Sequence, residues 1–181
     1  MRIINYLFLF CFLACSSGKI KSNWNDYFDT KSFFDDQIKS LHAQHVVLEK
    51  QLMFNGKNET VISDSINWEK ELNAFLSIDL LKPSYVGRFS KDSITVDENF
   101  YLITYECDDK RTDLKKAELN FDMNTKKLRS IIFLMRNKNA IFESEKQLIY
   151  FTDSAYIISG MQNIKLVEGA KYLVKGRFLK R

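Results

Sequence analysis

Cysteine is scarce in this chain, and its three copies stand at Cys11, Cys15 and Cys107. The first two lie in an apolar run at the N-terminus, so the body of the chain retains only Cys107. A single thiol cannot form an internal disulfide, and the fold must therefore be held together by an apolar core. A chain of 181 residues is long enough to build such a core, and its length predicts one domain.

Proline and glycine are also few, with one proline, Pro83, and six glycines. This scarcity argues against a disordered or low-complexity body, and no repeat of fixed period is present. The balance of 27 Lys and Arg against 23 Asp and Glu gives a formal net charge of +4. So mild an excess does not require a nucleic acid, and we expect no nucleic-acid partner.

Catalytic signatures are missing as well. The chain has only two histidines, and it contains no Gly-x-Ser-x-Gly elbow, phosphate loop, dinucleotide fingerprint or His-Glu-x-x-His motif. We therefore predict that the protein is not an enzyme and that it has no catalytic residues and no cofactor.

The N-terminus is the most informative segment that the chain does have. Met1 and Arg2 precede an apolar run of twelve residues, Ile3 to Ala14. As a helix this run would span about 18 Å, whereas the hydrocarbon core of a bilayer is roughly 30 Å thick. One positive charge before a short apolar run is typical of an export signal and not of a transmembrane helix.

The end of this run, Ala14 followed by Cys15, resembles the lipobox of bacterial lipoproteins of the Bacteroidetes type. The resemblance implies that a lipid is attached to the Cys15 thiol and that the signal is cut before it, where Ala14 supplies the small residue. Cys11 fits less well because bulky Phe10 precedes it. The sequence departs from the usual pattern at Phe12, where leucine is commoner.

The same resemblance carries expectations about domains and location. We expect a signal peptide at 1–14, a lipidated tether at 15–25 and a single domain at 26–181. Ser16 stands where an aspartate would retain the protein in the inner membrane, and no acidic cluster follows Cys15. Both absences favour the periplasmic leaflet of the outer membrane. The alternative is an ordinary signal cut after Ser16, without lipid.

Apolar spacing predicts two helices in the first half of the domain. The first covers 26–44, with Asp26 or Asp29 as its cap and an aromatic-rich stripe. The second covers 67–80, capped by Ser65 or Asn67, and Pro83 ends it. The stripe residues are Tyr27, Phe34, Ile38, Leu41 and His45 in the first helix, and Trp68, Leu72, Phe75, Leu76 and Leu80 in the second.

Strand patterns with short turns fill the remaining chain. Asn55-Gly56 predicts a tight hairpin between the first two strands, and Glu168-Gly169 predicts the last turn. The predicted strands are 46–54, 59–62, 85–89, 100–107, 116–121, 128–135, 141–151, 155–159, 163–167 and 172–179. Strands without intervening helices indicate an antiparallel meander. We expect an α+β fold in which two helices pack on a curved antiparallel sheet of about seven strands, with the early hairpin at one edge.

Two segments predict how the sheet is covered. Lys116, Glu118 and Asn120 alternate with apolar residues and mark a face open to water. Residues 129–135 are apolar on both faces of their strand, which predicts a central strand. We expect a helix to cover one face of that strand and something else to cover the other.

Candidate metal and nucleophilic residues are few. His42 and His45 are three apart on the predicted helix and could share one metal ion, although no acidic residue supports them there. Cys107 has no histidine nearby in sequence, and its strand pattern predicts a small buried hydrophobe. We therefore predict no metal site and no nucleophile.

Two further segments are candidate binding sites: the carboxylate-rich turn at 106–113 and the basic C-terminal segment. A calcium ion needs about six oxygen ligands, and Lys110 and Arg111 neutralise the carboxylates here, so a solvated hairpin loop is favoured. The carboxylates are Glu106, Asp108, Asp109 and Asp113. The basic segment 175–181 could contact anionic headgroups, or form an edge strand whose cations prevent edge-to-edge pairing.

Taken together, these patterns predict a membrane-anchored envelope lipoprotein that acts as a non-enzymatic binding or accessory domain. Its partners would be the lipid bilayer, through acylated Cys15, and another envelope protein. The alternative is a carrier or sensor of an apolar ligand, held in a cavity between sheet and helices, as in the layout of periplasmic lipoprotein carriers that it resembles. The aromatic content of 14% motivates that alternative, although aromatic residues also fill ordinary cores.

Overall fold

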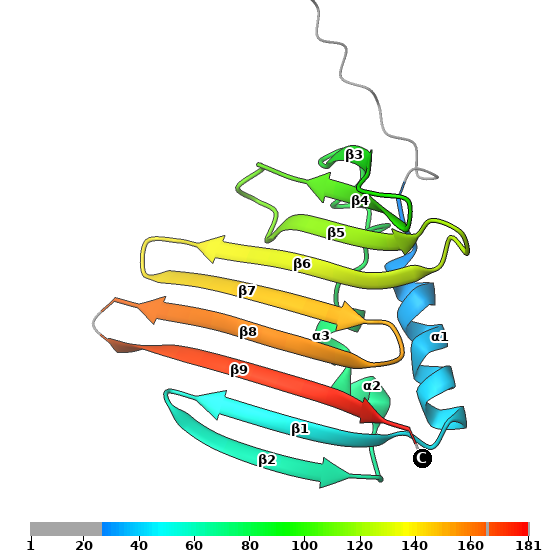
Figure 1. The fold of residues 1–181 in the computed structure, drawn as a ribbon. Helices are drawn as coiled ribbons and strands as arrows, with labels where there is room; N and C mark the ends of the chain where they lie inside the picture. The colour runs from blue at the N-terminus through cyan, green and yellow to red at the C-terminus, as the bar shows by residue number, and fades with distance from the viewer. Residues whose placement is uncertain (1–26, 166, 181) are drawn as a thin grey trace, which may run out of the picture.

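The computed structural model describes residues 27–165 and 167–180 (Figure 1). The predicted signal, the lipidation site Cys15 and the tether lie outside the described residues. Within those two ranges, no helix combines the length and the apolar character needed to cross a bilayer.

A single antiparallel sheet organises the described chain, with strand order β2-β1-β9-β8-β7-β6-β5-β4-β3. Its strands are β1 (Val47–Phe54), β2 (Lys57–Ser63), β3 (Ser90–Thr95), β4 (Phe100–Glu106), β5 (Leu114–Asp122), β6 (Leu128–Lys138), β7 (Phe142–Phe151), β8 (Ala155–Ile164) and β9 (Val167–Leu179). The expected α+β arrangement of two helices on about seven strands is therefore wrong, because the described residues are mostly β and form nine strands.

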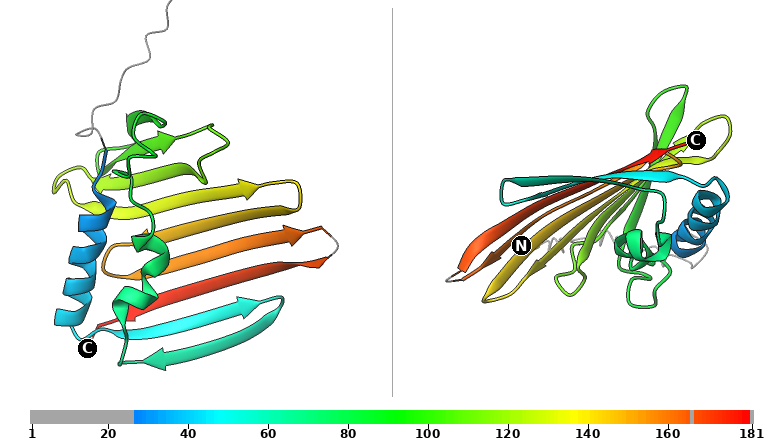
Figure 2. Two further views of the ribbon diagram at one scale, coloured as in Figure 1. Left: turned by 180° about the vertical axis from the view of Figure 1, so that it is seen from behind. Right: turned by 90° about the horizontal axis from the view of Figure 1, so that it is seen from below.

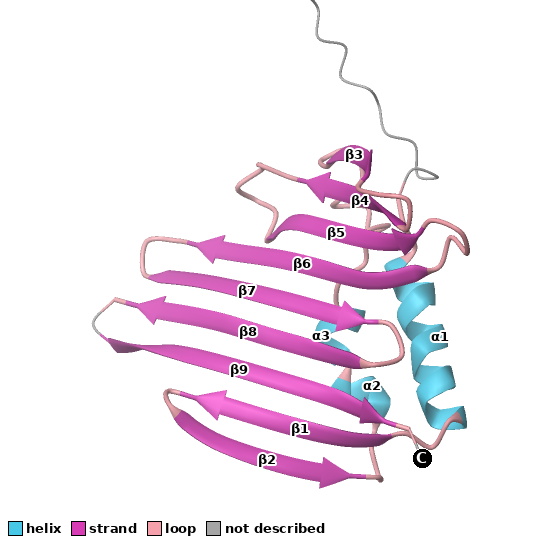
Figure 3. Ribbon diagram, in the orientation of Figure 1, coloured by secondary structure: helices cyan, strands magenta, loops and turns pink. Residues whose placement is uncertain are grey.

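The helices of the described residues pack on one face of this sheet and gather near one end of the strands (Figures 2 and 3). They are α1 (Thr30–Ala43), α2 (Trp68–Glu71) and α3 (Asn73–Leu76). Asp29 caps α1 by accepting a hydrogen bond from the Ser32 amide at 2.9 Å, and Asn67 caps α2 in the same way. We call the covered side of the sheet the helix face and the other side the open face.

The predicted second helix at 67–80 is wrong in its length. Two four-residue helices replace it, and helical structure ends at Leu76. Thr30 of α1 supplies the physical reason: its hydroxyl donates to the Ile78 carbonyl at 2.7 Å and accepts from the Leu80 amide at 3.2 Å. The side chain thus pairs with two backbone groups beyond α3, of which the Leu80 amide would bond within a longer helix.

Several predicted strands also differ from the structure. The predicted strand 85–89 is absent from the described structure: these residues lie in a turn region, with Gly87 at a φ of +77°. Strand β3 follows and was not predicted, because its residues are all exposed and do not alternate between buried and exposed positions. The predicted strands 155–159 and 163–167 are one continuous strand, β8, up to Ile164, and the predicted turn at Glu168-Gly169 lies within β9. Gly160 of this strand leaves room for the Tyr172 side chain opposite it on β9, because a Cβ there would lie 2.4 Å from the Tyr172 hydroxyl oxygen.

The last strand lies inside the sheet and not at its edge. β9 pairs with β8 on one side and with β1 on the other, where Leu48 is opposite Phe178. The expectation that the basic C-terminal segment forms an edge strand is therefore wrong. The early hairpin is at an edge, as predicted, and Asn55 and Gly56 form its turn with φ values of +45° and +84°.

An aromatic cluster fills the space between the helices and the sheet. Tyr150 lies at its centre, with ring centroids 5.1 Å from Phe34 and 5.6 Å from Phe75. Such edge-on pairs contribute about 0.5–1.5 kcal/mol each beyond the area they bury. Burial raises the pKa of the Tyr150 phenol, whose hydroxyl donates to Gln37 of α1 at 3.0 Å.

A polar contact secures the other end of the helical layer. Glu71 at the end of α2 accepts a hydrogen bond from the Tyr156 hydroxyl and forms an ion pair with Lys50 of β1 at 2.8 Å. Burial, followed by this hydrogen bond, raises the pKa of Tyr156. The helices are therefore fixed to both β1 and β8, on the helix face alone.

Replacing Thr30 with valine tests the contact that ends α3. The substitution keeps the side-chain shape but leaves the Ile78 carbonyl and the Leu80 amide unpaired in a buried place, so we expect Thr30→Val to lower the free energy of unfolding by about 1–3 kcal/mol. Urea denaturation measures the change. The control Thr95→Val, on exposed strand β3, should change stability by less than about 0.5 kcal/mol.

Candidate binding surface

The open face carries a row of isoleucines across three adjacent strands. Ile132 of β6 is opposite Ile149 of β7, which in turn is opposite Ile157 of β8. Leu134 stands two residues along β6 on the same face, since side chains alternate along a strand. We call these four residues the apolar strip. Each is half-buried by its neighbours, and no helix of the described chain lies over it (Figure 2).

Charged pairs border the apolar strip on the same face. Arg177 pairs with Glu49 on one side, and Lys116 contacts Glu118 at 2.9 Å and Glu106 at 3.2 Å on the other. Towards the far end of the strands, Arg136 pairs with Glu145, and Lys138 with Glu143 at 2.9 Å. Exposed pairs of this kind contribute little to stability. These pairs, together with exposed Lys175 opposite Ile157, give the apolar centre a charged border, and an apolar centre with a polar rim is the anatomy of a protein interface.

Shallow hollows also lie on the open face. One of about 410 Å³ is lined by Leu134, Glu145 and Met161, among others, and another of about 250 Å³ by Gln51, Ile157 and Arg177, among others. Five hollows formed by the described residues all lie on the sheet, and no residue of α1, α2 or α3 lines any of them. Between helices and sheet, where an apolar cavity was the alternative expectation, these hollows provide no ligand site.

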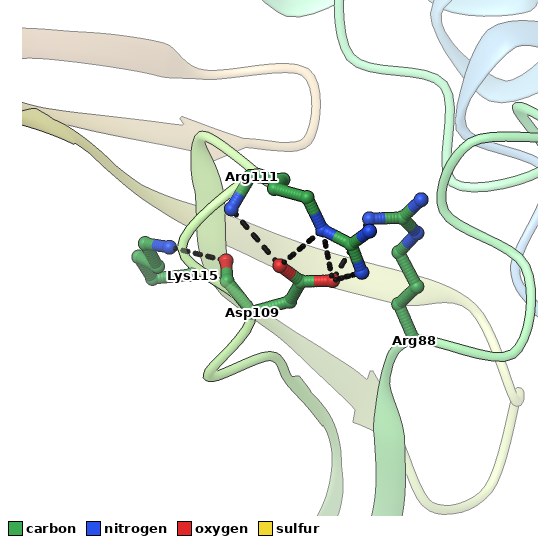
Figure 4. Close-up of polar contacts among 4 residues, drawn as sticks. All are labelled: Arg88, Asp109, Arg111 and Lys115. Atoms are coloured by element: carbon green, nitrogen blue, oxygen red, sulfur yellow. Dashed lines mark hydrogen bonds and ion pairs between the residues drawn. The ribbon is translucent and has the colours of Figure 1, made fainter.

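Asp109 of the β4–β5 loop is held by Arg88, Arg111 and Lys115 (Figure 4). Asp109 accepts hydrogen bonds from the Arg111 side chain, the shortest at 2.7 Å, and from Arg88 at 2.9 Å. Lys115 donates to the carbonyl of Asp109 at 2.8 Å. Arg88 comes from the segment before β3, so sequence proximity could not reveal it.

The remaining carboxylates do not converge on a metal site. Asp113 accepts a hydrogen bond from the Tyr85 hydroxyl at 2.7 Å, and Glu106 pairs with Lys116. Across the described residues, no group of three or more His, Cys, Asp and Glu side chains is placed to hold a metal ion. Burial, followed by the hydrogen bond to Asp113, raises the pKa of Tyr85.

The histidines and Cys107 occupy separate places. His42 is exposed on α1, with Nε2 3.7 Å from Glu69 Oε1. His45 follows the helix with a φ of +48° and is exposed, so it does not extend the buried stripe as the spacing predicted. Cys107 is buried, as its strand pattern predicted, with 3% of its surface exposed.

Comparisons with known proteins identify no family. No protein-family model matches the chain, and no curated protein matches it. Among solved structures, it is similar to an S-type phycobiliprotein lyase CPES from Guillardia theta, with 9% identity and a TM-score of 0.28. That similarity covers 85% of this chain and 93% of the lyase chain. We draw no argument from a likeness of this degree.

Asp109 provides a pH-dependent test of the loop. Hydrogen bonds from Arg111, and the charge of Arg88, hold the pKa of Asp109 well below its usual range. The pKa of an aspartate in the unfolded chain is about 3.9. The ion pairs of Asp109 therefore stabilise the fold above that pH, and this stabilisation is lost as the pH falls from there towards the lower pKa of the folded state. We expect Asp109→Asn to lower the melting temperature at neutral pH and to reduce its decline below pH ~4. Thermal melts across pH measure this, and the exposed control Lys110→Ala should retain the decline.

Proposed function

We propose that the protein is a non-enzymatic binding module that an acyl chain on Cys15 holds at the cell envelope. In this proposal the open face of its sheet binds another envelope protein. The apolar strip is the observation that carries the proposal. The signal-like N-terminus supports the location, namely the periplasmic leaflet of the outer membrane.

The sequence predicts a cover over the apolar strip that the described chain does not provide. The double-sided apolar pattern of 129–135 predicts a cover on both faces of β6. The helices cover the face with Ile131 and Phe133, which are fully buried, whereas the described chain brings nothing over Ile132 and Leu134. A partner protein would supply the missing cover. Burying the exposed remainder of each strip residue would contribute about 1 kcal/mol before the cost of association.

The anchor leads to a direct labelling prediction. We expect Cys15→Ala to abolish the incorporation of radioactive palmitate and to release the protein from washed membranes, because the thiol would be the attachment point. Cys11→Ala is the matched control, since it removes the other cysteine of the same apolar run, and it should keep both properties. Label and membrane association that survive in Cys15→Ala would exclude the anchor.

The open face leads to a second prediction, tested by crosslinking in intact cells. A photo-reactive phenylalanine analogue at Ile149, in the middle of the apolar strip, should give a discrete crosslinked product. The same analogue at Val61 is the control, because Val61 is 43% exposed on the opposite side of edge strand β2. We expect no discrete product there.

Each outcome of the crosslinking experiment has a clear meaning. A product at Ile149 with the mass of one further protein supports the proposed interface, and mass spectrometry then identifies the partner. A dimer of this chain would show that a second copy covers the strip. Equal products at both positions, or none at Ile149, would contradict binding through the open face.

A further inference from the structure

Three hairpin turns lie at the end of the strands away from the helices, the end at which the β4–β5 loop also lies (Figure 1). They join β1 to β2, β6 to β7 and β8 to β9. Phe142 is opposite Ile164, so the last two turns lie side by side, whereas Phe54 is opposite Tyr172, five residues along β9 from Val167, so the β1–β2 turn is set back from them. We call this end of the sheet, which is formed by strand ends and their turns and not by an edge strand, the tip edge. Its apolar side chains are strongly exposed: Met53 42%, Phe54 56%, Ile141 65% and Ile164 37%.

The turns of the tip edge are fixed to one another by backbone hydrogen bonds. The Lys165 amide donates to the Ile141 carbonyl at 3.0 Å, which joins the β8–β9 turn to the β6–β7 turn. The Asn55 amide donates to the Lys171 carbonyl at 3.0 Å, and the Lys171 amide donates to the Asn55 side chain at 2.8 Å. The exposed apolar residues are therefore presented by an ordered edge.

Lysines accompany each apolar tip. Lys57 follows the first turn and Lys165 follows Ile164, while Lys171 lies beside Asn55. Within the part of the chain that the structure describes, none of these three has an ion-pair partner, whereas the nearby Glu143 is paired with Lys138 at 2.9 Å. The described edge thus combines exposed apolar side chains with three lysines that form no ion pair there, although the same hairpins also carry the carboxylates Glu59 and Glu168 in sequence.

We infer that the tip edge docks on an anionic bilayer surface, with Phe54, Ile141 and Ile164 inserted among the lipid headgroups. Separate apolar tips flanked by cations suit an interface in which side chains enter lipid one by one. The inference rests on the proposed anchor: twelve residue steps join Cys15 to Tyr27, and an extended chain of that length reaches about 40 Å. A strand of ten residues spans about 33 Å, so anchor and tip edge can meet one membrane.

This docking would orient the domain for binding. If only the strand ends contact the bilayer, the strands project from the membrane surface, and both faces of the sheet remain accessible. The apolar strip on the open face would then be accessible to another envelope protein.

Quenching of tryptophan by brominated lipid tests the inference. The mature chain is purified from envelopes and reconstituted in vesicles of phosphatidylethanolamine and phosphatidylglycerol with brominated acyl chains. Phe54→Trp places a reporter at the tip edge, and Phe151→Trp makes the same substitution at the far end of β7, where Phe151 is 39% exposed. The parent chain gives the background from Trp24 and Trp68.

We expect quenching of Phe54→Trp and none above background for Phe151→Trp. Adding Lys57→Glu and Lys165→Glu to Phe54→Trp should shift the ratio of docked to undocked protein about tenfold or more towards undocked, from the lost attraction to anionic lipid. Lys127→Glu, an exposed lysine in the β5–β6 turn, is the control and should leave the quenching unchanged.

The contrary outcomes are also distinct. An unquenched Phe54→Trp, or stronger quenching of Phe151→Trp, would overturn the docking of this edge. The mass of the N-terminal peptide from the same preparation reports the acyl group on Cys15. If that group is absent, the proposed anchor fails, and the quenching of Phe54→Trp on the same vesicles still decides whether the edge docks.

Discussion

The described structure depends on the packing of a small helical layer against one end of a large sheet. Tyr150 lies at the centre of that contact, where its ring meets Phe34 of α1 and Phe75 of α3. One helix of fourteen residues and two of four residues cannot cover nine strands on even one face. The rest of the sheet must therefore be stabilised by its ladder and by cross-strand pairs, and its outer surfaces stay available for other molecules.

The distribution of polar contacts follows from the same arrangement. On the helix face, polar groups beside the helices have specific partners, such as Glu71 with Tyr156 and Lys50. On the open face, the Arg136–Glu145 and Arg177–Glu49 ion pairs join neighbouring strands, and the half-buried apolar strip lies between them without a cover from the described chain. Stability is thus concentrated on one side of the sheet, and the proposed binding role on the other.

Local patterns predicted much of this fold, and non-local contacts explain most of what they missed. Asp29 as a cap, the Asn55-Gly56 turn and the burial of Cys107 follow from short-range signals, and the structure confirms them. The early end of the second helix depends on Thr30, which lies 48 residues before its acceptor Ile78. The pairing of β1 with β9 joins the two ends of the domain, and the exposed strand β3 has no alternation, so neither leaves a local signal.

For the candidate surface, the sequence revealed the apolar pattern but not the geometry. Residues 129–135 predicted that Ile132 and Leu134 would be covered, and only the register shows that Ile149 and Ile157 extend their row. Maleimide labelling of Ile149→Cys tests for a partner on the open face, because buried Cys107 contributes little background. If a partner covers the strip, Ile149→Cys reacts fast in the purified protein and slowly in intact envelopes, while Val61→Cys reacts equally in both. Equal labelling of Ile149→Cys in the two preparations would contradict a partner on the open face.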